Sequence, residues 1–276
     1  MNIIETTHLF PKLNDLLVQL AENMDQDDWH KKTHFPNWTV KDIFTHLLDT
    51  SVRRLSSERD KYVSLEKPKI ECHQDLIDYI TQMADRWALA FTNVSPTIII
   101  EMINKYQNDL YEYLVSLDPF GISKHPVSWA GEQESYNWFD IAREYTERWH
   151  HQMQIREVLG NTNKLYKHEL YYPILDTFMQ ALPYHYSKLN EKKDYTLKVS
   201  VTGDNIDSSW FLESTKNIRE LKYNSTKQID AYILVDEKIA WKILTKWNEK
   251  ELENTVNIRG DIDLGQHFLG MTCLMI

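Results

Sequence analysis

Cysteine, glycine and proline are all scarce in this sequence. Its 276 residues include two cysteines, Cys72 and Cys273, and only seven glycines and eight prolines. Two cysteines do not make a disulfide framework, which favours a reducing compartment. The low glycine and proline content, with 42% hydrophobic residues, excludes a disordered chain and predicts one or two folded domains.

Long apolar runs and basic patches are also lacking. No apolar run approaches the length that spans a bilayer, and the start, "MNIIETTHLF", lacks the features of a signal peptide. The net charge of −10 argues against binding to a nucleic-acid backbone. The nearest approaches to basic patches, Arg53-Arg54 and Lys192-Lys193, are interpreted as solvated surface. We therefore expect a cytoplasmic protein with a small-molecule substrate and no nucleic-acid or membrane partner; a homodimer is left open.

Apolar residues recur with helical spacing through the first part of the chain. Thr39 with Asp42 predicts a capping box, Ser95-Pro96 predicts another helix start, and Gly160 predicts a helix end. The expected helices cover residues 5–24, 39–62, 73–92, 95–117, 136–159 and 169–189.

After Lys192 the apolar period changes to two, which is typical of half-buried strands. Strands are expected at 194–203, 208–214, 217–224, 228–236 and 254–260, and helices at 236–247 and 263–276. The sequence therefore predicts an α + α/β protein of two domains, in which a helical domain precedes a small α+β domain. The boundary is expected between residues 160 and 195.

The helix expected at 136–159 carries a polar stripe that packing alone does not require. Glu147 and His151 are four residues apart and share one helix face, and Gln154 continues that stripe. A carboxylate and an imidazole supply two donors to a divalent metal. His46, inside an otherwise apolar helix stripe, is the natural third ligand. The alternative, a hydrogen-bonded polar network in the core, stays open.

Other histidines fit such a site less well. His150 lies about 100° around the helix from its neighbour His151, so it does not easily serve the same metal. His30 and His34 are also four residues apart, but they fall in an expected loop and are interpreted as surface residues.

Two arginines are candidate catalytic residues, and two tryptophans are candidates for the wall of a substrate site. Arg143 is placed to support the metal-binding carboxylate, and Arg259, at an expected strand end, to hold a substrate carboxylate. Ordinary surface interactions are the alternative for both. Trp38 and Trp129 lie in expected loops near the open end of the helical domain, and both are interpreted as packing residues rather than as walls of a substrate site.

Two motifs resemble a known family. "NWTVKDIFTHLLD", residues 37–49, resembles a Trp-x-Val-x-Asp-x-x-x-His-Leu segment, and "AREYTERWHHQMQIRE", residues 142–157, resembles an Arg-x-x-x-Glu-x-x-x-His segment. Both segments are found in the DinB-like metal-binding superfamily and, within it, in the mycothiol-dependent maleylpyruvate isomerase family. The resemblance implies metal ligands at His46, Glu147 and His151, the same residues that the spacing selects.

The family resemblance also implies an architecture and a departure from the family pattern. It implies a DinB-like four-helix bundle in residues 1–165 and a sterol-carrier-like α+β domain in residues 166–276. Gln154 stands where many isomerase-like members have an aspartate.

The activity that the resemblance implies is metal-dependent. We expect a divalent metal, zinc first and nickel as an alternative, that activates a low-molecular-weight thiol for isomerisation or S-transfer. Two alternatives are left open. One is a metal-dependent hydrolase that activates water, and the other is a non-catalytic module that holds a small apolar ligand.

Overall fold

Two compact units make up the chain in the structure, a computed structural model that describes residues 3–35, 37–66, 68–189, 194–216, 218–247 and 252–273. The helical unit consists of Thr6–Lys124 and Glu144–Leu165. The mixed unit consists of Met1–Glu5, His125–Arg143 and Tyr166–Met275. The predicted domain division at residue 165 stays a prediction, and Lys192-Lys193 lies outside the described residues.

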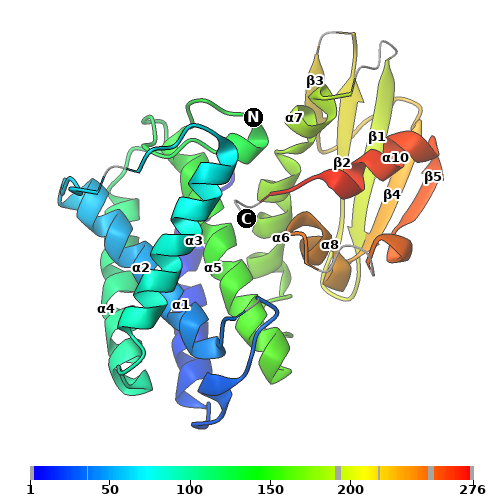
Figure 1. Cartoon of the computed structure of the whole chain (residues 1–276). Helices are drawn as coiled ribbons and strands as arrows, with labels where there is room; N and C mark the ends of the chain where they lie inside the picture. The colour runs from blue at the N-terminus through cyan, green and yellow to red at the C-terminus, as the bar shows by residue number, and fades with distance from the viewer. Residues whose placement is uncertain are drawn as a thin grey trace. The chain divides into compact units, whose positions relative to one another are not determined.

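The helical unit contains the helices that the apolar periodicity predicts, and α4 packs against α1 and α2 (Figure 1). The part of α5 before Glu144 belongs to the mixed unit. A π-helical turn, Leu55–Arg59, follows α2 directly, so the predicted helix at 39–62 is shorter and changes type. The helices are α1 Phe10–Glu22, α2 Val40–Arg54, α3 His73–Ala90, α4 Pro96–Val115 and α5 Asn137–Leu159.

The helix ends lie where local chemistry predicts them. The Thr39 hydroxyl accepts a hydrogen bond from the Asp42 backbone N–H, and the Asp42 carboxylate accepts one from the Thr39 backbone N–H. This capping box satisfies N–H groups that the first turn of α2 leaves without partners. Ser95 caps α4, with Pro96 at its first position. Gly160 follows α5 with a φ of +67°, a left-handed conformation that glycine adopts without strain.

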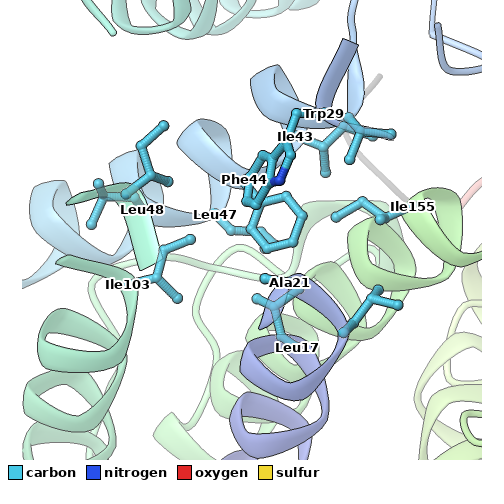
Figure 2. Close-up of a cluster of buried hydrophobic side chains, with 12 residues drawn as sticks. Leu17, Ala21, Trp29, Ile43, Phe44, Leu47, Leu48, Ile103 and Ile155 are labelled. Carbon is cyan, nitrogen blue, oxygen red and sulfur yellow. The ribbon is translucent and has the colours of Figure 1, made fainter. Parts of the chain in front are cut away.

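An apolar cluster lies in the core of the helical unit (Figure 2). Trp29 packs on Phe44 with ring centroids 4.6 Å apart. Their neighbours come from α1, α2, α4 and the end of α5, and include Leu17, Ala21, Ile43, Leu47, Leu48, Ile103 and Ile155. Burial of this cluster holds α2 in place on both sides of the position that His46 occupies.

The mixed unit contains a five-stranded sheet in the order β3-β2-β1-β4-β5 (Figure 1). β1 pairs antiparallel with β2 and parallel with β4. α7 lies against β3, α8 against β1 and β4, and α10 against β4 and β5. The strands are β1 Tyr195–Thr202, β2 Asp207–Ser214, β3 Arg219–Lys222, β4 Ala231–Asp236 and β5 Asn257–Gly260, and the helices are α6 His168–Met179, α7 Leu182–Ser187, α8 Glu237–Leu244 and α10 Ile262–His267.

The predicted alternation is confirmed in β4, in which Ala231, Ile233 and Val235 are buried and the residues between them are more exposed. It is wrong for β1, which was expected to be half-buried, because Thr196 and Ser200 are buried as well as the apolar residues of this central strand. The structure combines helices with a five-stranded sheet, which agrees with the predicted α + α/β fold class. None of the helices among the described residues has both the length and the apolar character needed to cross a membrane.

Two further helix predictions were wrong in length. The helix predicted at 169–189 is broken between α6 and α7, because Pro183 in the first turn of α7 does not continue a preceding helix. The helix predicted at 263–276 ends at His267 and is followed by a short 3-10 turn. The Cys273 N–H then donates to the Leu244 carbonyl oxygen, a tertiary contact that replaces helical bonding. Residues 274–276 lie outside the described residues.

Candidate metal site

Helix α2 presents His46 about two turns after its cap. Leu47 and Leu48, the next two residues, are buried in the core of the helical unit. The imidazole of His46 keeps part of its surface exposed, yet its Nδ1 atom is buried and has no hydrogen-bond partner among the described residues. Burial lowers the pKa of His46 well below its ordinary value, so its ring is neutral at pH 7.

Helix α5 presents Glu147 and His151 on one face, as their spacing predicts. The Nε2 atom of His151 lies 3.7 Å from the Oε2 atom of Glu147. The Glu147 side chain keeps 26% of its surface exposed and that of His151 keeps 9%. Burial lowers the pKa of His151 to about 4, so this ring is also neutral at pH 7.

The two imidazoles from different helices meet in the helical unit. The ring centroids of His46 and His151 are 4.6 Å apart, and the rings are edge to face at 75°. The three predicted ligands are therefore neighbours. Among the described residues, however, no group of three or more His, Cys, Asp or Glu side chains is closed around one point that an ion would occupy. The metal assignment therefore stays a proposal.

Gln154 determines which nitrogen of His151 carries the proton. The Oε1 atom of Gln154 lies 2.8 Å from Nδ1 of His151, and its Nε2 atom lies 3.3 Å from Nε2 of His150. An amide oxygen only accepts hydrogen bonds, so Nδ1 of His151 carries the proton and donates. Nε2 of His151, on the side of Glu147, then keeps its lone pair. A metal-ligating histidine is usually held by its other ring nitrogen in this way.

The donor set fits a divalent metal ion. Two neutral imidazoles and one carboxylate are ligands that zinc and nickel accept. A buried imidazole nitrogen without a partner, such as Nδ1 of His46, is satisfied either by a hydrogen bond or by a metal ion. His150 is buried with its Nε2 beside the Gln154 amide, which agrees with its exclusion from the ligand set. His30 and His34 are exposed, as predicted.

Trp38 lies against the ring of His46, with centroids 5.2 Å apart. The indole N–H donates to an oxygen of Asp85 on α3 at 3.1 Å, which fixes the ring in the loop before α2. The sequence gives no periodic pattern for a loop residue, so this proximity was not predictable. Trp38 covers one edge of the candidate metal site as well as packing.

Buried charged side chains lie beside the site. Arg54 is 6% exposed, which contradicts its interpretation as solvated surface, because it forms ion pairs with Glu58 and Glu144. Glu144 raises the pKa of His46 and Arg148 lowers it, both less than burial does. A polar residue at a core-facing helix position is the sequence feature that would have identified them.

The two candidate catalytic arginines both belong to the mixed unit. The guanidinium of Arg143 donates to the buried carboxylate of Asp140, one turn earlier on α5, at 2.7 Å. Arg259 is exposed on β5, and its Nε atom donates to the side-chain oxygen of Asn257 at 3.1 Å. Their catalytic assignments stay predictions.

Comparison with solved structures supports the fold that the two motifs indicated. A structure of a mycothiol-dependent maleylpyruvate isomerase, in a histidine-to-alanine mutant form, matches with a TM-score of 0.52 and 9% identity, over 88% of this chain and 91% of that chain. A protein described as the UbiJ-SCP2 ubiquinone synthesis protein matches over 37% of this chain and 90% of its own, with 19% identity and a TM-score of 0.27. No family model matches the chain, and no curated protein is similar to it in sequence. At 9% identity, the likeness to the isomerase is one of fold.

Proposed function

We propose that His46, Glu147 and His151 bind one divalent metal ion, with zinc as the preferred candidate and nickel as the alternative. We also propose that the protein is a metal-dependent enzyme that uses a thiol. One observation carries the proposal. Two neutral imidazoles from separate helices, that of His151 buried and that of His46 partly buried, have ring centroids 4.6 Å apart beside a partly exposed carboxylate. Three protein ligands leave room for other groups, as in catalytic zinc sites.

Each ligand residue has its own role in this proposal. Burial keeps His46 in the neutral form that donates a lone pair, and Gln154 keeps the proton of His151 on Nδ1. Glu147 brings the one negative charge of the set and keeps 26% of its side-chain surface open to solvent. A metal bound there lowers the pKa of a thiol, so that the thiolate forms near neutral pH.

The reaction class that we propose is isomerisation or S-transfer by the thiolate, in a fold shared with a thiol-dependent isomerase. Addition of the thiolate to a conjugated double bond forms a C–S bond and leaves a single bond that rotates. Elimination of the thiolate then restores the double bond, and no oxidant or reductant is consumed. If a proton is captured instead, the product keeps the thiol, and the same site acts as an S-transferase. Trp38 shields one edge of the site from water.

Metal content tests the ligand assignment. Tag-free protein purified without chelator should contain close to one equivalent of zinc or nickel, and stripped protein should rebind one equivalent of Zn²⁺ or Co²⁺ in calorimetric titration. His46→Ala, Glu147→Gln and His151→Ala should each lose this binding. A double variant of the exposed pair, His30→Ala with His34→Ala, should keep it and serves as the matched control. Wild-type protein that binds no divalent metal would remove the proposal.

A screen of low-molecular-weight thiols with unsaturated electrophiles tests the reaction. Turnover should require both thiol and metal and should be lost in Glu147→Gln. Metal-dependent turnover of ester or amide substrates without any thiol would show a hydrolase instead. A co-purified apolar ligand in metal-free, inactive protein would favour the binding module.

A further inference from the structure

Four buried charged residues join the two helices that carry the proposed ligands. Arg54, Glu58, Glu144 and Arg148, here called the buried charge cluster, have side chains between 3% and 8% exposed. Nη1 of Arg54 lies 3.3 Å from Oε2 of Glu144, and Nη2 of Arg148 lies 2.9 Å from Oε1 of the same carboxylate. Glu144 therefore bridges a guanidinium from each helix.

The local backbone places Glu58 in the same cluster. It lies in the π-helical turn Leu55–Arg59 at the end of α2, and its Oε1 atom is 3.2 Å from Nε of Arg54. The hydroxyl of Tyr113 on α4 donates to its Oε2 atom at 3.2 Å. π-helical turns are rare and occur often at functional sites. The cluster thus joins α2, α4 and α5 and carries two positive and two negative charges.

Stability alone does not account for such a cluster. Removing charges from water opposes the gain from pairing them, and apolar side chains of similar volume often stabilise a core as well or better. Buried polar groups are best attested where they fix the register between packed elements. The register between α2 and α5 is what brings His46 to His151.

The cluster lies close to the ligands along both helices. Nη2 of Arg148, the residue after Glu147, also donates to the hydroxyl of Ser51 on α2 at 3.0 Å. Both carboxylate oxygens of Glu144 accept from arginines, so Glu144 is engaged by the cluster rather than by the metal site. If α5 slipped by one helical turn, His151 would move by about 5.4 Å along the helix axis. This movement is larger than the 4.6 Å between the ring centroids of His46 and His151, so the contact between the rings would be lost.

We propose that the buried charge cluster is a positioning device that fixes the register of α2 against α5 and so places His46 beside Glu147 and His151. A test of this inference by metal affinity rests on the proposed function, because it requires that the protein binds a metal ion. A test by the structure of the metal-free protein does not rest on it. The cluster residues are positioning residues and do not touch substrate.

Arg156 offers a matched control on the same helix. Its side chain is also buried, and its guanidinium donates to the backbone oxygens of Leu16 and Asn161 and to the side chain of Gln152. Arg148→Met and Arg156→Met therefore both remove a buried guanidinium from α5, but only Arg148 belongs to the cluster. Glu144→Gln is a near-isosteric second variant in case Arg148→Met does not fold.

The first measurement compares Co²⁺ affinity and the visible Co²⁺ spectrum with urea unfolding of the metal-free proteins. Arg148→Met and Glu144→Gln should bind Co²⁺ about 10–100-fold more weakly and with an altered spectrum, as expected when support of metal ligands is lost. Arg156→Met should unfold at lower urea but bind Co²⁺ like wild type. Equal losses of affinity in Arg148→Met and Arg156→Met would overturn the inference, because they would reflect general destabilisation.

The second measurement needs no metal. Crystal structures of the metal-free cluster variants should show α5 shifted along α2 and the rings of His46 and His151 farther apart than 4.6 Å. An unchanged ring contact in both Arg148→Met and Glu144→Gln would overturn the inference even if wild-type protein binds metal. If wild-type protein binds no metal but the shift is seen, the proposed function fails and the positioning role stands.

Discussion

The imidazole ring of His46 meets that of His151 edge to face, with centroids 4.6 Å apart. The two residues come from α2 and α5, which are far apart in the chain. Both rings are neutral at pH 7, because burial opposes their protonation. Two neutral imidazoles in contact avoid the repulsion of two charges and leave lone pairs for a ligand.

The protein should become less stable as the pH falls, because these two histidines have lowered pKa values in the folded state. The pKa of His151 is about 4 in the folded protein, against an ordinary value of 6.5, so the unfolded chain binds more protons between these values. The unfolding free energy should therefore be highest above about pH 6.5 and decrease as the pH falls towards 4, by at most about 3 kcal/mol from this residue. The pKa of His46 is shifted in the same direction.

Urea unfolding of metal-free protein between pH 4.5 and 7.5 checks this dependence. His151→Asn should give a shallower decrease than wild type over the same range. A wild-type slope that the substitution leaves unchanged would mean that His151 titrates normally in the folded protein.

Gln154 should matter for metal affinity more than for folding. Gln154→Leu removes the acceptor of the His151 Nδ1 proton, so the ring loses its fixed tautomer and orientation. We expect a 10–100-fold loss of Zn²⁺ or Co²⁺ affinity in calorimetric titration. Gln152→Leu is the matched control, because Gln152 is also buried on α5 but donates to the Leu13 backbone oxygen. Similar affinities for the two variants would exclude a role of Gln154 in holding the ligand.

The capping box of α2 should contribute measurably to stability. Thr39→Ala removes the hydroxyl that accepts from the Asp42 N–H, and we expect a loss of about 1 kcal/mol in urea unfolding. Thr50→Ala, in the interior of the same helix, should cause little loss, because alanine has the higher helix propensity. Equal losses at both positions would show that the cap is not what stabilises the start of α2.

The apolar cluster beside His46 should be sensitive to a cavity. Phe44 is 1% exposed and packs on Trp29 at the centre of the cluster (Figure 2). Phe44→Ala should lower the unfolding free energy by about 3–5 kcal/mol. Leu65, at 93% exposure, is the control, and Leu65→Ala should change it by less than about 0.5 kcal/mol. A small loss at Phe44 would mean that the cluster collapses around the cavity.

Local chemistry accounts for most of what the sequence predicts correctly. The start of α2 follows from Thr39 and Asp42, and the buried residues of β4 follow from an alternation that a strand imposes. The shared face of Glu147 and His151 follows from their spacing in α5. These features depend on residues within one or two helical turns of one another.

What the sequence does not predict depends on contacts between distant segments. No spacing shows that Arg54, next to the half-exposed Arg53, is buried against Glu144 of α5. The closing helix ends at His267, and the backbone N–H of Cys273 donates instead to the distant Leu244 carbonyl oxygen, a contact that local propensity does not anticipate. Trp38 reaches His46 from a loop. His46 was identified as a candidate by its polar character within an apolar stripe, but its contact with His151 required the structure.

Titration of the metal-stripped protein with Co²⁺, followed by its visible absorption, tests the central claim most directly. We expect a spectrum that saturates at one equivalent and is lost when any of His46, Glu147 or His151 is replaced. Absence of a protein-bound Co²⁺ spectrum in the wild type, or an unchanged spectrum in His46→Ala, would contradict a site shared by α2 and α5.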